Sequence, residues 1–421
     1  MRISKSISVF LVLIGGILPL MTAAQAMPKL MLPIGHTDGV RSAQFSPDGK
    51  MVLTLSYDSL PKIWDVRSGR LLADFSGHTD YVRSAEFSPD GRFVLTASDD
   101  ETAKIWDVGS CKLITEITGH FGTVLTAEYS LDGMRVVTSS TDGTAKIWQT
   151  RSGKLLTELK GHTEYLTSAQ FSPDGRRVVT ASGDSTAKIW EAGSGKLIAD
   201  LRGHDGWVRS AEFSPDGLYV VTVSKGGAAK IWEVSSGKLI ADLRGHTGSV
   251  YSAQFSSDGQ RVVTSSQDNT AKIWDAASGK LLVDLKGHTG EVKSAVFSLD
   301  GQRVVTASWD STAKIWEAGS GKLIVDLRGH NDWVESAEFS PDGQRVVTAS
   351  GDSTAKIWDA GSGKLVADFS GHTRYFPYAE FSPDSRQIIT TSGDSTAVVW
   401  DVSSGKLLIS LRMNTGYVNS A

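Results

Sequence analysis

Short hydrophobic stretches separated by polar turn residues recur along most of the chain. Within residues 77–118, the turn Ser88-Pro89-Asp90-Gly91 suits a tight reversal, because proline fixes φ and glycine allows a positive φ. Helical periodicity is absent beyond residue 26. We therefore expect a four-stranded antiparallel meander in this segment. Its predicted strands are Val82–Phe87, Phe93–Ser98, Thr102–Asp107 and Leu113–Ile117.

The meander repeats with a period of 42 residues, without insertion or deletion. Each unit begins with Gly-His, and a tryptophan follows 28 residues after each histidine. The nine units are 35–76, 77–118, 119–160, 161–202, 203–244, 245–286, 287–328, 329–370 and 371–412. One such sheet cannot bury both of its faces, whereas copies arranged radially bury face against face. The predicted fold is all-β, a β-propeller of four-stranded antiparallel blades with nine repeats in one ring; seven or eight blades plus extra repeats is the alternative.

The motifs of each unit resemble those of the WD40 repeat. In the second unit they are Gly77-His78, the turn Ser88-Pro89-Asp90-Gly91, Asp100 and Trp106-Asp107. The resemblance covers 35–412 and implies a propeller that serves as a binding platform, usually without catalysis. It does not identify the partner.

The resemblance also implies a buried polar network in each unit. Asp100 would orient His78, His78 would meet the hydroxyl of Thr96, and that hydroxyl would accept from the Trp106 indole. An enzyme needs one acid–base constellation in one pocket, so a repeated one indicates a structural role. We expect no catalytic residue, no metal site and no cofactor. An enzyme that uses the central channel is a less favoured alternative.

The fifth unit departs from this pattern. Gly226 stands where the other units have aspartate, within Lys225-Gly226-Gly227. His204 is then expected to lose its carboxylate partner, and a buried unpaired group costs about 1–3 kcal/mol. The sequence predicts that this unit opens first and that Gly226→Asp raises the melting temperature.

Two series of positions vary while the rest of the unit is nearly constant. Both fall in loops at the same end of the predicted sheets, the usual partner-binding end in the WD40 family. The first series is Gly39, Tyr81, Thr123, Tyr165, Trp207, Ser249, Glu291, Trp333 and Tyr375. The second is Tyr57, Asp99, Thr141, Gly183, Lys225, Gln267, Trp309, Gly351 and Gly393.

Large residues in these series concentrate in units that are neighbours in a closed ring. Aromatic residues with arginine are typical of interface anchors, so we expect a protein or peptide to bind there. Neutral drift and sugar stacking are the alternatives. The candidate binding residues are Trp309, Trp333, Tyr375, Tyr57, Tyr81, Arg374 and Trp207.

The predicted innermost strands carry a recurring acid or amide, with Val296 in the seventh unit. We interpret these residues as cross-strand partners of cations such as Arg135, Arg345 and Lys104, in preference to a cation site. The series is Gln44, Glu86, Glu128, Gln170, Glu212, Gln254, Glu338 and Glu380. Cys111, the only cysteine, stands at a turn position that is glycine in the other units, which excludes an intramolecular disulfide.

The first 26 residues have the features of a bacterial export signal. Arg2 and Lys5 precede an apolar run, and Ala24-Gln25-Ala26 forms an A-x-A cleavage site. We expect cleavage after Ala26, a periplasmic or secreted protein, and no membrane insertion of the mature chain; an uncleaved anchor is the alternative. Residues 27–34 resemble an N-terminal strand and 413–421 a partial tenth repeat, and such spare strands make self-association a further alternative.

The charge balance narrows the partner class. The chain has 43 basic and 47 acidic residues, with a formal net charge of −4. Nucleic-acid binding needs clustered cations, which this mildly acidic composition does not favour.

Overall fold

The computed structural model describes residues 35–374 and 378–411. These residues form nine four-stranded antiparallel sheets, and no helix occurs among them. Each sheet, here called a blade, takes all four strands from one 42-residue unit, in the order first, second, third, fourth. The predicted all-β propeller with nine blades is therefore confirmed.

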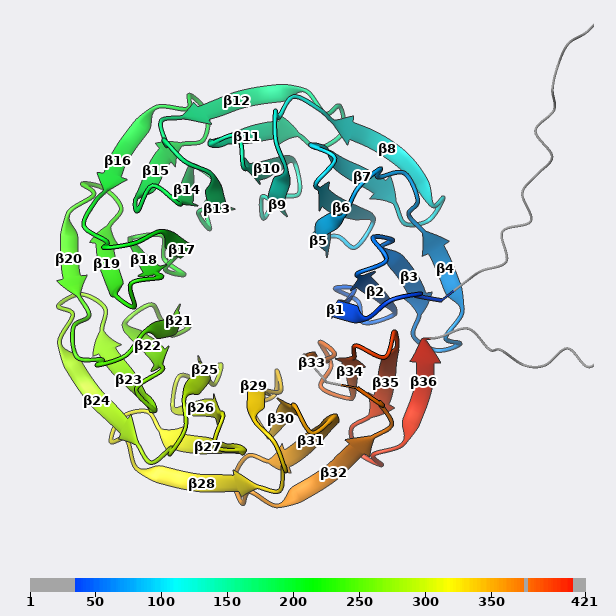
Figure 1. Cartoon of the computed structure of the whole chain (residues 1–421), viewed down its shortest axis with the longest axis vertical. Helices are drawn as coiled ribbons and strands as arrows, with labels where there is room; N and C mark the ends of the chain where they lie inside the picture. The colour runs from blue at the N-terminus through cyan, green and yellow to red at the C-terminus, as the bar shows by residue number, and fades with distance from the viewer. Residues whose placement is uncertain (1–34, 375–377, 412–421) are drawn as a thin grey trace, which may run out of the picture. The chain divides into compact units, whose positions relative to one another are not determined.

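The four strands of each blade are arranged in sequence order, with the first strand at the central channel and the fourth at the perimeter of the ring (Figure 1). The first, innermost strands are β1 (Val40–Phe45), β5 (Val82–Phe87), β9 (Val124–Tyr129), β13 (Leu166–Phe171), β17 (Val208–Phe213), β21 (Val250–Phe255), β25 (Val292–Phe297), β29 (Val334–Phe339) and β33 (Tyr378–Phe381). The second strands are β2 (Met51–Ser56), β6 (Phe93–Ser98), β10 (Arg135–Ser140), β14 (Arg177–Ser182), β18 (Tyr219–Ser224), β22 (Arg261–Ser266), β26 (Arg303–Ser308), β30 (Arg345–Ser350) and β34 (Gln387–Thr391).

The third strands carry the repeated tryptophan, and the fourth strands form the outer edge. The third strands are β3 (Lys62–Asp65), β7 (Ala103–Asp107), β11 (Thr144–Gln149), β15 (Ala187–Glu191), β19 (Ala229–Glu233), β23 (Thr270–Asp275), β27 (Thr312–Glu317), β31 (Thr354–Asp359) and β35 (Ala397–Asp401). The fourth are β4 (Leu71–Asp74), β8 (Lys112–Ile117), β12 (Leu155–Lys160), β16 (Leu197–Leu201), β20 (Leu239–Asp242), β24 (Leu281–Lys286), β28 (Leu323–Arg328), β32 (Leu365–Ser370) and β36 (Leu407–Leu411).

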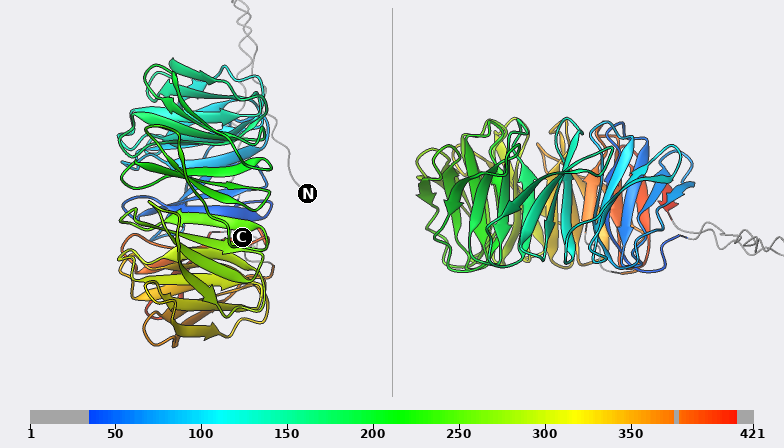
Figure 2. Two further views of the ribbon diagram at one scale, coloured as in Figure 1. Left: turned by 90° about the vertical axis from the view of Figure 1, so that its left-hand side faces the viewer. Right: turned by 90° about the horizontal axis from the view of Figure 1, so that it is seen from above.

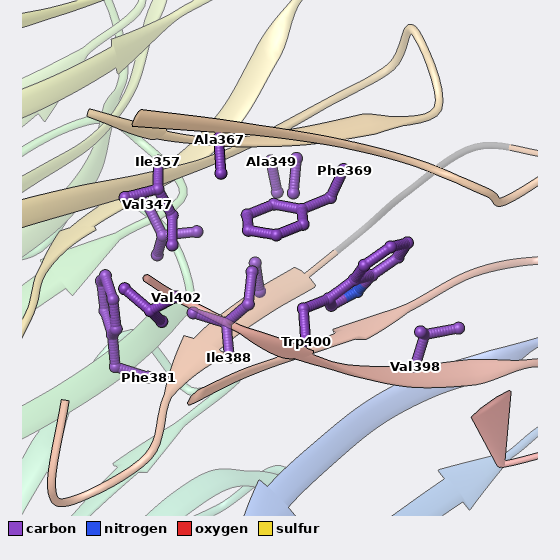
Figure 3. Packing of buried hydrophobic residues seen from close by; sticks show 12 residues of the cluster. Val347, Ala349, Ile357, Ala367, Phe369, Phe381, Ile388, Val398, Trp400 and Val402 are labelled. Atoms are coloured by element: carbon purple, nitrogen blue, oxygen red, sulfur yellow. The ribbon is translucent and has the colours of Figure 1, made fainter. Parts of the chain in front are cut away.

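The hydrophobic core lies between blades rather than within them. Each of nine buried clusters joins one face of a blade to the facing side of the next. Figure 3 shows the cluster between the eighth and ninth blades, in which Phe369 meets Trp400 with ring centroids 5.0 Å apart. Apolar burial of this kind stabilises by about 25 cal/mol per Å², so every blade depends on both neighbours.

The first and ninth blades pack together and close the ring. Val40 N–H donates to the Ser392 carbonyl at 2.9 Å, and one buried cluster contains Val40 and Phe45 together with Ile389 and Leu411. The ninth blade supplies its own fourth strand, β36, which pairs with β35. The ring therefore closes by side-to-side packing of complete blades. The spare strands expected at 27–34 and 413–421 lie outside the described residues.

The loops gather on two opposite faces of the ring (Figure 2). Loops from fourth to first strands and from second to third strands lie on one face, here called the histidine face because it carries the Gly-His pairs. The Ser-Pro-Asp-Gly turns and the third-to-fourth turns lie on the opposite face. Cys111 is exposed in one of these latter turns with φ of 57°, a conformation that glycine adopts at less cost.

Candidate functional site

A polar network fixes the loops of the histidine face in each blade. In the second blade, His78 Nδ1 lies 2.8 Å from Asp100 Oδ2, and His78 Nε2 lies 2.7 Å from Thr96 Oγ1. The Trp106 indole Nε1–H donates to the same hydroxyl at 3.0 Å. All nine blades contain the contacts among histidine, threonine and tryptophan, with Nε2–Oγ1 distances of 2.7–3.1 Å.

The protonation states of the network follow from its geometry. Because Asp100 can only accept when ionised, His78 Nδ1 carries the hydrogen and Nε2 accepts from Thr96. Burial alone would raise the pKa of Asp100, but hydrogen bonds from Thr102, Thr79 and His78 outweigh it and hold that pKa at about 2. Burial lowers the pKa of His78 despite the aspartate. The network therefore holds a neutral imidazole against a carboxylate and anchors two loops together.

The fifth blade lacks the carboxylate, as the sequence predicts. His204 Nε2 still lies 2.7 Å from Thr222 Oγ1, and Trp232 donates to that hydroxyl at 2.8 Å. His204 Nδ1, however, is buried without a hydrogen-bond partner, and so is Ser224 Oγ. Burial, assisted by the nearby Lys230 charge, lowers the pKa of His204 to about 4.

The described residues of the two variable series lie in loops of the histidine face, and together they are here called the rim. Within a blade, the second-series N–H donates to the first-series carbonyl, as Trp309 does to Glu291 at 2.9 Å; this bond occurs in eight blades. At four blade junctions, the second-series residue also contacts the first-series residue of the next blade: Tyr57 with Tyr81, Gln267 with Glu291, Trp309 with Trp333, and Gly393 with Gly39. At the junction of the ninth and first blades, a Cβ on Gly39 would lie 3.1 Å from Gly393 Cα.

Aromatic and charged side chains of the sixth, seventh and eighth blades form a tryptophan cluster: Tyr251, Glu291, Lys293, Trp309, Trp333 and Glu335. The two indole centroids are 6.2 Å apart at 44°. Lys293 Nζ lies 4.4 Å from the Trp309 ring and 3.7 Å from the Tyr251 ring. Trp309 Nε1–H donates to Glu335 at 3.2 Å, and Tyr251 O–H donates to Glu291 at 2.6 Å. Trp309 is 46% exposed and Trp333 39%.

A second group, the tyrosine cluster, joins the first and second blades through Arg41, Tyr57, Tyr81, Arg83 and Asp99. Tyr57 and Tyr81 stack with centroids 6.2 Å apart. Both arginines lie over Tyr81, at 5.2 Å and 4.9 Å, and Arg83 also pairs with Asp99. The Tyr81 ring thus contacts two cations and the neighbouring Tyr57 ring, while the Tyr57 residue is 58% exposed.

The other candidate residues do not join these clusters into one. Trp207 lies in the fifth blade, where Lys225 Nζ is 5.4 Å from its ring. Arg374 is exposed in the ninth blade, and Tyr375 lies outside the described residues. The described part of the rim between the two clusters contains Gly351, Gly393 and Gly39.

A third series of residues was missed by the sequence analysis. In eight first strands the second residue falls in a register shift, and such bulges re-aim a side chain. Arg41, Tyr251 and Lys293 occupy this position and reach the rim clusters. Comparison of the units at this column would have revealed its variability, but not the bulge that turns it toward the rim.

The expected pairing of inner-strand acids with cations is wrong. Lys104 pairs with Glu116 because the strand register sets these two residues opposite each other. Arg345 likewise faces Asp359 across the strands, and Arg135 lies over the Phe171 ring at 5.1 Å.

The inner-strand acids and amides instead reach across to the next blade. Glu86 accepts from Tyr129 N–H at 2.7 Å, and Glu338 accepts from Phe381 N–H at 3.0 Å. Glu380 accepts from Phe45 N–H, which spans the junction of the ninth and first blades. Burial raises the pKa of Glu86 to about 7 and that of Glu338 to about 8. These side chains therefore link blades along the channel wall.

Comparison with known proteins identifies the family. The family described as "WD40: WD domain, G-beta repeat" matches residues 28–65, 69–107, 111–149, 153–191, 195–233, 237–275, 279–317, 321–359 and 363–401. The chain therefore belongs to the WD40-repeat family, whose propellers commonly act as protein-interaction scaffolds. A search of curated proteins gives no match.

A solved structure supports the same fold assignment. The crystal structure of the computationally designed Ika8 protein is similar, with a TM-score of 0.62 and 31% identity, over 78% of this chain and 99% of that chain. No helix long and apolar enough to cross a membrane is found among the described residues.

Proposed function

We propose that this chain is an exported, non-catalytic scaffold that binds a protein or peptide through the rim. The observation that carries the proposal is that two series of positions at which near-identical units differ lie together in the loops of one face. Nine repeated histidine–threonine–tryptophan contacts hold the loops beneath it. A rigid support with variable residues on top is the arrangement expected of a recognition surface.

The tryptophan cluster is the favoured anchor within the rim. Two adjacent indoles, each more than a third exposed, are flanked by Lys293, Glu291 and Glu335, so an apolar patch has charged groups of both signs at its border. Apolar centres with polar borders are typical of binding hot spots. A peptide with an apolar or aromatic side chain flanked by charged residues would match this chemistry.

Affinity capture from a periplasmic extract tests the proposal. The double variant Trp309→Ala/Trp333→Ala should lose the partner that the wild-type chain retains, with an unchanged melting temperature because both side chains are substantially exposed. The matched control is Leu131→Ala/Met134→Ala, which removes 75% and 69% exposed side chains from the opposite face. Capture retained by the tryptophan variant, or lost by the control alone, would contradict the assignment.

Export is a separate part of the proposal and rests on residues 1–26. Expression of the full chain in a bacterium should yield a periplasmic product whose N-terminal residue is Met27. A product that keeps residues 1–26, or one found only in the cytoplasm, would refute cleavage after Ala26.

Self-association is a second candidate, favoured by the perimeter of the ring. Within residues 35–374 and 378–411, the fourth strands pair on one side only and expose adjacent apolar side chains, such as Leu113 at 42% and Ile114 at 48%. Such edges can pair with other chains. A solution mass above that of one chain, reduced by Ile114→Lys, would support assembly, whereas a monomeric mass would exclude it.

A further inference from the structure

The network aspartate of a regular blade collects hydrogen bonds from fixed backbone and side-chain donors. In eight blades it accepts from histidine Nδ1 at 2.7–3.2 Å. It also accepts from the backbone N–H after that histidine at 2.8–3.1 Å. A third donor is the N–H two residues after the aspartate, at 2.9–3.1 Å. Seven of these blades add a threonine hydroxyl.

The fifth blade keeps the equivalent donors but supplies no acceptor of its own. The donors are His204 Nδ1 and the backbone N–H groups of Asp205 and Ala228; the hydroxyl is lost because position 228 is alanine. Thr222 Oγ1 lies 2.7 Å from His204 Nε2 but 3.5 Å from the Lys230 carbonyl, so its hydrogen goes to the imidazole. His204 Nδ1 therefore carries a hydrogen, and this buried donor has no partner among the described residues.

The space at this position is shallow and open to the histidine face. Gly226 is exposed, and a Cβ placed on it would have its nearest neighbours at 3.7 Å, an ordinary contact. Gly226, Gly227 and Ala228 also border a cavity of about 580 Å³ between the fifth and sixth blades. The residues Gly226, Gly227 and Ala228 are small, and glycines allow this loop to change conformation at little cost.

The charges around the loop are mixed. Lys225 and Arg244 contribute positive charge at the surface, while Asp205 contributes negative charge. Asp242, behind the loop, pairs with both Lys230 and Arg244 at 2.7 Å and is therefore largely compensated. The electrostatic field of these mixed charges does not repel an anion strongly, but it does not by itself explain anion binding. The specificity must therefore come from the fixed hydrogen-bond donors.

We propose that the fifth blade is a carboxylate-binding site, in which an external carboxylate takes the place that the network aspartate occupies in the other eight blades. One oxygen would accept from His204 Nδ1 and Asp205 N–H, and the other from Ala228 N–H. The carboxylate comes either from a small free anion or from an acidic side chain of a bound peptide. This site lies outside the tryptophan and tyrosine clusters and does not depend on the function proposed for them.

Formate is the first probe, because it is the smallest carboxylate. In wild-type protein, formate should raise the melting temperature saturably, by about 1–2 °C for a ligand at several times its Kd. The chain has nine histidines, so nitrogen-15-labelled histidine spectra resolve the site: formate should shift one imidazole and raise its titration midpoint. Sodium chloride at equal ionic strength is the anion control.

Two variants test whether the effect belongs to this site. Gly226→Asp supplies an internal carboxylate and should abolish the formate response. Asp184→Gly, in the fourth blade, removes the carboxylate acceptor and leaves its hydrogen-bond donors in place. This variant should therefore have a second formate-responsive histidine, His162. Equal responses of wild-type and Gly226→Asp protein, no saturable response in wild type, or a chloride effect equal to that of formate would overturn the proposal.

A peptide arm distinguishes the two sources of the carboxylate. An acetylated, amidated pentapeptide of glycine with a central aspartate should compete with formate for the same imidazole signal if the site takes a side chain. The same peptide with asparagine serves as the control. Binding of formate without competition by the acidic peptide assigns the site to a free small anion.

Discussion

Gly226→Asp is the perturbation that connects the polar networks to stability most directly. The new carboxylate would accept from His204 Nδ1 and from two backbone N–H groups, and removing one buried unpaired donor is worth about 1–3 kcal/mol. The backbone at 226 is outside the positive-φ region and the added Cβ meets nothing closer than 3.7 Å. Restricting the unfolded chain adds about 0.4–1 kcal/mol, whereas repulsion from exposed Asp205 is screened. We expect a net gain of about 2 kcal/mol.

The gain should appear both globally and locally. For a chain of this length, about 2 kcal/mol corresponds to a rise of about 2–4 °C in melting temperature, measured by calorimetry in carboxylate-free buffer. Because repeat proteins open unit by unit, amide exchange in β18 and β19 should slow in Gly226→Asp protein and be faster than in β14 and β15 in the wild type. The reverse change, Asp184→Gly, is the matched control and should lower the melting temperature and speed amide exchange in β14 and β15 of the fourth blade. An unchanged or lower melting temperature in Gly226→Asp protein would refute the reasoning.

Three further predictions follow from other parts of the ring. The network aspartates have folded pKa values well below the unfolded value of about 3.9, as for Asp100 at about 2. Their contribution to stability is therefore complete above about pH 4 and is lost as pH falls toward 2. Acid unfolding followed by circular dichroism should show this loss. Glu86 and Glu338 have pKa values raised to about 7 and 8, so the stability of the fold should fall as pH rises from 5 to 8. The double variant Glu86→Gln/Glu338→Gln should flatten the dependence of the urea midpoint on pH. An unaltered slope would show that these two carboxyl groups do not cause the pH dependence. Gly351→Ala places a Cβ 2.6 Å from the Trp333 indole and should displace that ring. We expect calorimetric titration to show partner binding weakened several-fold, with little change in the melting temperature. Unaltered affinity would argue against Trp333 as an anchor.

Most of the fold could be predicted because each local signal agrees with the others. The strand bounds expected for 77–118 match β5 and β6 and differ by one residue at the start of β7 and of β8. The uninterrupted 42-residue period gave the number of blades, since no insertion obscures a unit. Closure without a shared strand could not be predicted, because the sequence offered both a complete ninth blade and spare end segments.

The site was less predictable because contacts between blades decide it. Comparison of the units identified Trp309 and Trp333 as variable but could not show that they meet, since that depends on the spacing of adjacent blades. The role of Glu86 was misassigned for the same reason: its hydrogen-bond donor is the Tyr129 N–H of the next blade. Within a blade, by contrast, the loss of the partner of His204 could be inferred from Gly226 alone, because the network is local and repeated eight times.

Hydrogen–deuterium exchange of the chain with its captured partner would test most directly whether recognition occurs at the rim. We expect protection of peptides that contain 291–309 and 331–335, and little change in the turns of the opposite face around 131–134 and 299. Protection confined to those turns or to the fourth strands, with the rim peptides unchanged, would contradict the account.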